Sequence, residues 1–141
     1  MKANYKRILL ITTCLLLTFV SCEDILVDDP FADPIEKFLG TWKAHETKDP
    51  FDGLWVYDVV ITRNPQNSTE ILISNFNLQG SRERARAMIT GNMVIIPVQY
   101  ICDNTIRIEG SGSYRDGEIT LSYTTNDGAD LKRFNATYFK P

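Results

Sequence analysis

The sequence predicts an all-β fold, an eight-stranded antiparallel up-and-down barrel, with a two-sheet β-sandwich as the alternative. From residue 40 onward, apolar and polar residues alternate with a period of two, whereas the helical period of about 3.6 is hard to find. Turn signals built from Gly, Asn and Asp separate the alternating segments. An eight-stranded meander would leave two unpaired edges, and closure into a barrel removes both of them.

Eight strands are predicted within a domain that covers residues 37–141. In chain order they span residues 40–47, 55–63, 69–76, 82–90, 93–100, 105–114, 118–125 and 130–139. A helical turn near residues 34–38 is expected to plug one end of the barrel. The turns at 91–92, 116–117 and 126–128 are short, so consecutive strands should be neighbours in the sheet. Short turns favour the barrel over a Greek-key sandwich, which requires longer crossovers.

Alternation gives the strands of the first half two different faces. In the strand at 40–47, polar residues share the outward face, which consists of Thr41, Lys43, His45 and Thr47. The strand at 55–63 groups Trp55, Tyr57, Val59 and Ile61 on one face. After the strand at 69–76, the strand at 82–90 has Ala85, Ala87 and Ile89 on one face and a basic stripe, Arg82, Arg84 and Arg86, on the other. This basic stripe either attracts an anionic ligand or partner or is simply a strand face exposed to solvent.

The strands of the second half follow the same rule. The strand at 93–100 groups Val94, Ile96, Val98 and Tyr100 on one face. In the last three strands the residues predicted to face inward are Ile106, Ile108, Ile119, Leu121, Tyr123, Phe134, Ala136 and Tyr138. Gly110 and Gly112 also fall on the inward face, and Pro97 removes a ladder donor. These residues predict a sharp corner and a bulge, both of which closure of a small barrel requires.

The amino-terminal segment, residues 1–21, has the pattern of a secretion signal. Three basic residues precede an apolar run, residues 8–20, which is too short to span a membrane because a spanning helix needs about 20 residues. The run ends at Ser21 and Cys22, and a small residue directly before cysteine resembles the lipobox of bacterial lipoproteins. The resemblance implies that the signal is cleaved before Cys22 and that lipid is attached to its sulfur, which anchors the protein to the membrane.

Residues 22–36 are predicted to be an acidic tether between this lipid and the domain. The acidic residues nearest to Cys22 are Glu23, Asp24, Asp28, Asp29 and Asp33, and no basic residue appears before Lys37. Acidic residues directly after a lipid-bearing cysteine resemble the surface-export signal of lipoproteins in some Gram-negative anaerobes. The expected location is therefore the bacterial outer membrane at the cell surface, with a periplasm-facing position as the alternative.

Composition and charge exclude several functions. The chain is 43% hydrophobic and 23% charged, which fits a folded domain. Removal of the signal leaves 12 basic residues against 18 acidic ones, so the net charge is about −6. This negative charge argues against nucleic-acid binding, which needs a concentrated positive face. With one histidine and no cysteine pair, the sequence predicts no metal centre and no cofactor.

The segment from Phe38 to Trp42 reads Phe-Leu-Gly-Thr-Trp and resembles the Gly-x-Trp motif that opens lipocalins and their calycin relatives. In that family a helical turn leads into the first strand, and the tryptophan closes one end of the barrel. The stretches at 91–99, 110–112 and 127–128 are similar to small lipocalin-like lipoproteins of bacteria. The resemblance covers roughly residues 36–141. It implies a binding barrel, with a basic residue placed over the tryptophan, for which Arg133 and Lys140 are the candidates.

The other residues with reactive or ionisable side chains are predicted to have structural roles and not catalytic or metal-binding ones. His45 and the next residue point to opposite faces of a strand, so no acid–base pair forms there. Cys102 has an acidic neighbour and is expected to fill space. The acidic turn around Asp127 fits turn chemistry better than a calcium site. Because no nucleophile–base spacing, phosphate loop or metal motif is present in the sequence, no enzymatic activity is predicted.

The predicted function is that of a lipid-anchored envelope lipoprotein whose barrel binds a small apolar or amphipathic ligand. Trp42, Trp55 and Tyr57 are the residues expected to line the ligand site. The alternative is a structural or interaction protein whose filled barrel presents its loops to an envelope protein partner or a glycan. The interior of an eight-stranded barrel is just wide enough for either arrangement, and the sequence leaves both open.

Overall fold

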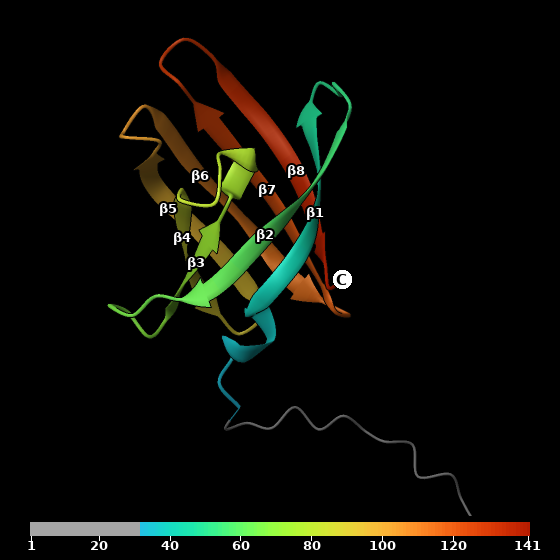
Figure 1. Ribbon diagram of the computed structural model, residues 1–141, viewed down its shortest axis with the longest axis vertical. Coiled ribbons are helices and arrows are strands. Elements are labelled where there is room, and N and C mark those ends of the chain that lie inside the picture. Colours follow the sequence, from blue (N-terminus) through green and yellow to red (C-terminus); the bar gives the residue numbers. More distant parts are fainter. Residues whose placement is uncertain (1–31) are drawn as a thin grey trace, which may run out of the picture. The chain divides into compact units, whose positions relative to one another are not determined.

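The computed structural model describes residues 32–141, and Ala32–Pro141 form one compact unit. Eight antiparallel strands close into a barrel in which each strand pairs with its neighbours in sequence (Figure 1). This arrangement confirms the predicted up-and-down barrel, and the β-sandwich alternative is wrong. The predicted signal, Cys22 and most of the predicted tether lie outside the described residues. No helix among the described residues is long and apolar enough to cross a membrane.

The strands have nearly the predicted bounds, with differences of at most two residues at any end. They are β1 (Gly40–Asp49), β2 (Leu54–Arg63), β3 (Glu70–Ser74), β4 (Arg84–Thr90), β5 (Met93–Ile101), β6 (Ile106–Arg115), β7 (Glu118–Asn126) and β8 (Leu131–Phe139). Two short 3₁₀ helices are present, η1 (Glu36–Phe38) before β1 and η2 (Phe76–Leu78) between β3 and β4. Closure is made by β1, which pairs with β2 on one side and with β8 on the other.

The barrel interior is filled along most of its length by the inward side chains of every strand. Isoleucine, alanine and aromatic side chains dominate this core. Its largest fully buried apolar members are Trp42, Tyr138, Phe38, Phe76, Ile35, Ile61, Ile71, Ile73, Ile96, Ile108 and Ile119. The core therefore accounts for the alternation in the sequence, because period-2 side chains meet on the inside of the cylinder.

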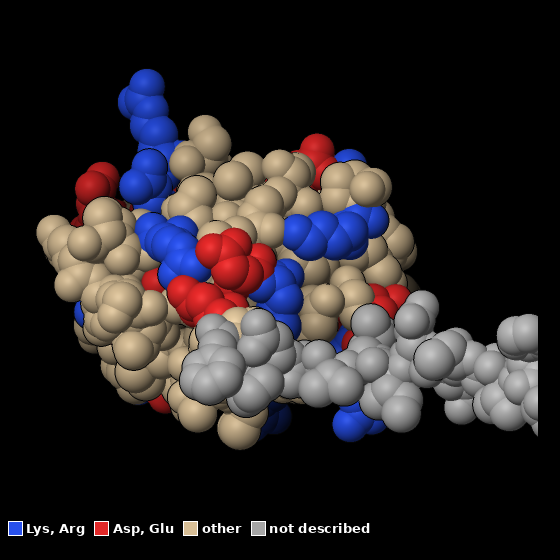
Figure 2. Space-filling view, turned by 90° about the horizontal axis from the view of Figure 1, so that it is seen from below, with Lys and Arg blue, Asp and Glu red and all other residues tan. Residues whose placement is uncertain are grey.

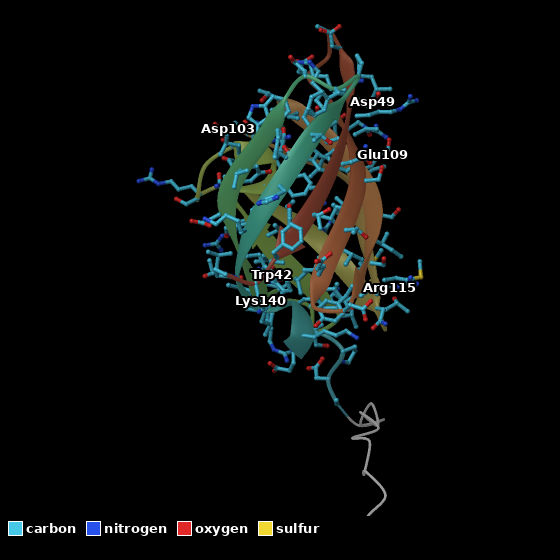
Figure 3. The ribbon with its side chains drawn as sticks, turned by 90° about the vertical axis from the view of Figure 1, so that its right-hand side faces the viewer. Trp42, Asp49, Asp103, Glu109, Arg115 and Lys140 are labelled. Carbon is cyan, nitrogen blue, oxygen red and sulfur yellow. The ribbon has the colours of Figure 1, made fainter. Side chains whose placement is uncertain are left out.

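One end of the barrel is closed by η1, as the sequence predicts. Phe38 is fully buried there, and its backbone oxygen accepts a hydrogen bond of 2.7 Å from the indole Nε1 of Trp42. Of the two basic candidates, Lys140 lies over the indole, with its Nζ 4.3 Å from the ring centroid. Both labelled side chains lie at the same end of the barrel in Figure 3. The tryptophan therefore fastens the helical turn to the first strand.

Charged side chains of both signs gather on the outside of this closed end, as Figure 2 shows from below. Arg63, at the end of β2, forms ion pairs with Asp33 at 2.7 Å and with Glu36 at 2.5 Å. Exposed ion pairs contribute little stability each, but this group links the first residue of η1 and the segment before it to the end of β2.

Strand β5 departs from the predicted alternation. The prediction that Val98 and Tyr100 share the inward face of Val94 is wrong, because these two side chains are 53% and 56% exposed. The register with β6 shifts between Ile96 and Gln99, next to Pro97, which has no backbone N–H to donate. The predicted bulge is therefore present, and it exchanges the two faces of the strand beyond it.

The side chain of Gln99 continues the sheet beyond this bulge. Its Nε2 donates to the backbone oxygen of Arg86 at 2.7 Å, and its Oε1 accepts from the Arg86 backbone N–H at 2.9 Å. The amide thus replaces the main-chain ladder between β4 and β5, whose paired residues run only from Met88 to Thr90 on β4.

The glycines of β6 face inward and allow β7 to approach closely. A Cβ atom at Gly110 would lie 2.3 Å from the Cβ of Tyr123, and one at Gly112 would lie 1.9 Å from the Thr120 backbone oxygen. Neither distance is compatible with a side chain, so glycine is needed at both positions. This close approach is the predicted corner of the barrel.

Candidate functional site

A pocket of about 320 Å³ opens at the end of the barrel opposite η1. Its walls come from the far ends of β1, β2 and β8 and from η2, and they consist of Glu46, Lys48, Asp52, Trp55, Asn77, Leu78, Gln79, Lys132 and Phe134. Figure 3 shows Asp49, the last residue of β1, at this open end, far from Trp42. The volume is close to the lower limit of about 300 Å³ for small-molecule sites.

Glu46 is the one carboxylate among the lining residues that is buried. It lies on the inward face of β1, and only 2% of its surface is exposed. Oε2 accepts a hydrogen bond of 2.7 Å from the Tyr57 hydroxyl and another from the Tyr123 hydroxyl, and Oε1 accepts one of 3.1 Å from Asn77 Nδ2. Strands β1, β2 and β7 and the η2 segment therefore converge on a single carboxyl group.

Burial raises the pKa of Glu46 above its ordinary value, because desolvation penalises the charged form more than the hydrogen bonds from Tyr123, Tyr57 and Asn77 favour it. The same burial raises the pKa values of the Tyr57 and Tyr123 hydroxyls, which stay protonated and remain donors. None of the ion pairs within residues 32–141 includes Glu46. Its charge therefore has hydrogen-bond partners but no cationic partner.

Aromatic residues of the pocket come from the strands on both sides of β1. Trp55 on β2 is directly opposite Glu46 in the register, and Phe134 on β8 is opposite Lys48. Phe134 stacks on the ring of Tyr123, with centroids 5.3 Å apart and planes 13° from parallel. These contacts hold Phe134 in place as one wall, so the pocket has apolar sides above a polar floor.

The rim of the pocket carries two lysines that are each paired with a nearby aspartate. Lys48 Nζ lies 3.3 Å from Asp52, and Lys132 Nζ lies 3.1 Å from Asp127. Backbone N–H groups in the Asp127 turn, with Lys132, lower the pKa of that carboxyl. The charges at the rim therefore cancel locally.

Exposed apolar side chains surround the same opening. They are Phe51 in the β1–β2 turn, Leu54 at the start of β2, Leu78 in η2 and Leu131 at the start of β8. By contrast, a hollow of about 590 Å³ on β6 and β7 near the closed end is lined only by polar and charged side chains. The open end thus offers exposed apolar surface beside the pocket, from which an apolar group can exclude water.

The three residues expected to line a ligand site lie in different places. Trp55 lines the pocket, Tyr57 is buried beneath it and holds Glu46, and Trp42 is at the closed end. The sequence prediction did not single out Glu46. The alternation that places His45 outside also places its neighbour inside, and His45 is indeed exposed, with its ring 5.0 Å from that of Phe139. That alternation was the available signal for Glu46.

Other candidates from the sequence lie apart from this pocket. Cys102 is half-buried, and burial raises the pKa of its thiol, which disfavours the reactive thiolate. Arg84 and Arg86 face outward on β4, whereas Arg82 lies before the strand. Within residues 32–141, no group of three potential metal-ligating side chains is present.

No known protein-family model matches the chain, and no curated protein matches it either. The fold and the site together define a closed eight-stranded barrel, consistent with a lipocalin-like fold, that has a pocket at one end and a plug at the other. The pocket is therefore the feature that bears on its function.

Proposed function

We propose that this protein is a lipid-anchored lipoprotein of the bacterial outer membrane, whose lipocalin-like barrel binds a small amphipathic ligand at its open end. The observation that carries the ligand-binding part of the proposal is the pocket of about 320 Å³, with aromatic walls and a buried carboxyl at its floor. Apolar contact with Trp55 and Phe134 would supply binding free energy at about 25 cal/mol per Å² of surface removed from water. Glu46 and Asn77 would orient a polar group.

Three features support the lipocalin-like assignment. The Gly-x-Trp motif lies at the start of β1, η1 plugs the adjacent end, and Lys140 covers the tryptophan ring. The pocket lies at the open end, next to the buried core, so a ligand would enter the mouth of the barrel without passing through it. Binding, not catalysis, is proposed, since the buried carboxyl contacts two hydroxyls and an amide and no nucleophile–base pair.

The first test is native mass spectrometry of the full-length chain released from lipid nanodiscs, with any bound small molecule identified. Gln79→Trp places a large side chain in the pocket wall, and Gln66→Trp is the matched control in an exposed turn at the closed end. We expect a bound molecule with the unaltered chain and the control but not with Gln79→Trp. A molecule retained equally by all three chains would contradict the proposed site.

The anchor and the location are tested separately. Cells fed radioactive palmitate should label the unaltered protein and not Cys22→Ala, and label retained by the variant would refute lipidation at that position. Protease added to intact cells should degrade the domain if it is displayed at the surface. Full protection would instead favour the periplasm-facing position.

The exposed apolar rim favours a second candidate, an interaction protein that presents its open-end loops to an envelope protein or glycan. Phe51 is the most exposed rim residue, with 76% of its surface accessible. Phe51→Ser and Leu131→Ser should then abolish co-purification of the partner while leaving small-molecule binding unchanged. Partner recovery that is unaffected by these variants would exclude this candidate.

A further inference from the structure

We infer that the pocket selects ligands that carry a positively charged amine, whose nitrogen contacts the carboxylate of Glu46 while its apolar part lies between Trp55 and Phe134. The inference rests on the proposed function, because it names the ligand class of the same pocket.

The hydrogen bonds around Glu46 are those of an ionised carboxylate. Tyr57, Tyr123 and Asn77 all donate to it, and Asn77 Nδ2 also donates to the Tyr123 hydroxyl at 2.8 Å. Asn77 Nδ2 can only donate, and the Tyr123 hydroxyl, which accepts from Asn77, directs its own hydrogen to Oε2, so these contacts suit the charged carboxylate. Oε2 accepts two of the bonds and Oε1 accepts one, so Oε1 retains capacity for a further donor.

A buried negative charge without a cationic partner is costly, and a ligand cation would offset that cost. Hydrogen bonds alone only partly replace the water that a carboxylate loses on burial. The raised pKa of Glu46 reports the same imbalance. A cation that reached Oε1 would favour the charged form, so ligand binding and ionisation of Glu46 would reinforce each other.

The lysines of the pocket do not supply this cation. Lys48 is paired with Asp52 and Lys132 with Asp127, and neither lysine forms an ion pair with Glu46. With these pairs neutralised, Glu46 is the remaining unpaired charge among the residues that line the pocket. A ligand carboxylate or phosphate would meet that negative charge, whereas an ammonium group would be attracted to it.

The aromatic walls fit the same class of ligand. Ring faces attract cations through their quadrupole, and tryptophan does so most strongly. Trp55 stands opposite Glu46 in the register, and Phe134 lies on the other side of β1. An alkyl or aryl ammonium would therefore find apolar contact, ring faces and a carboxylate within a single pocket.

The test compares three probes of equal length, hexylammonium, 1-hexanol and hexanoate, on the full-length chain in nanodiscs at neutral pH. Binding is followed by calorimetry, with empty nanodiscs as the blank. We expect hexylammonium to bind at least about tenfold more tightly than hexanol, and hexanoate to bind most weakly. Equal affinity for all three would overturn the amine inference but keep the proposed function, whereas absence of binding by any probe would overturn both.

Two variants assign the preference to the buried carboxyl. Glu46→Gln keeps the shape and removes the charge, so the advantage of hexylammonium over hexanol should disappear while hexanol still binds. Glu118→Gln is the matched control, because Glu118 is an exposed carboxylate near the closed end, and it should retain the full advantage. An advantage that persists in folded Glu46→Gln would overturn the inference. If that variant fails to fold, the comparison of probes on the unaltered chain still decides the question.

Discussion

The buried carboxyl makes a specific prediction about how stability depends on pH. Because burial raises the pKa of Glu46 in the folded state above its unfolded value of 4.5, the folded protein binds this proton more tightly than the unfolded chain does. The contribution of Glu46 to stability is therefore most favourable below pH 4.5, falls as the pH rises through the folded pKa, and stays at its lower value above it.

The size of this loss follows from linkage. Each tenfold difference in proton affinity between the folded and unfolded states corresponds to about 1.4 kcal/mol of unfolding free energy. Glu46→Gln removes the titration while keeping an amide that can accept from Tyr57 and Tyr123. The difference in stability between the unaltered chain and Glu46→Gln should thus move against the unaltered chain as the pH rises from about 4 to 8.

The assay is urea unfolding, followed by circular dichroism at a series of pH values. Asp33 and Asp127 have lowered pKa values, mainly because backbone N–H groups donate to them, so they give both chains the opposite slope. Their contributions cancel in the difference, and Glu118→Gln provides the control for an exposed glutamate. Stability curves of the unaltered chain and Glu46→Gln that run parallel across this range would refute the reasoning.

Three further predictions concern the barrel itself. Gly110→Ala should lower the unfolding free energy by about 3 kcal/mol or prevent folding, since its Cβ would lie 2.3 Å from a side-chain carbon of β7. Gln99→Leu should cost about 1 kcal/mol and speed amide hydrogen exchange at Arg86, whose N–H it leaves without a partner. Lys140→Met keeps the aliphatic stem but removes the cation over Trp42, and should cost about 0.5–1 kcal/mol in urea unfolding.

Matched changes at nearby exposed positions separate these effects from general disturbance. Ser111→Ala, next to Gly110 but outward, should stay within about 0.5 kcal/mol of the unaltered chain. An equally mild result for Gly110→Ala would contradict the close approach of β6 and β7. Unchanged exchange at Arg86 in Gln99→Leu would show that the side-chain amide does not replace the ladder.

The strands and their order could be predicted from the sequence because their signals are local. Alternation along β2, β7 and β8 and short turns such as Asp116-Gly117 depend only on residues close together in the chain. Closure into a barrel could be predicted because an open meander would leave the backbone N–H and C=O groups of two edge strands unpaired. Pro97 indicated a bulge for an equally local reason, the missing N–H, but the reversed exposure of Val98 and Tyr100 depends on how β5 pairs with β6 beyond it.

The site required the tertiary structure. The position of Glu46 inside the barrel follows from alternation alone, but its partners do not. In the sequence, Asn77 is 31 residues and Tyr123 is 77 residues away from Glu46. Asn77 also lies in the short helix η2, which no periodic pattern in the sequence indicates. Sequence by itself thus determined which side chains face inward, except in β5 beyond the bulge at Pro97. Only the folded chain decided which of them meet and where space remains, because contacts across a barrel and the volume left in it depend on the packing of all eight strands together.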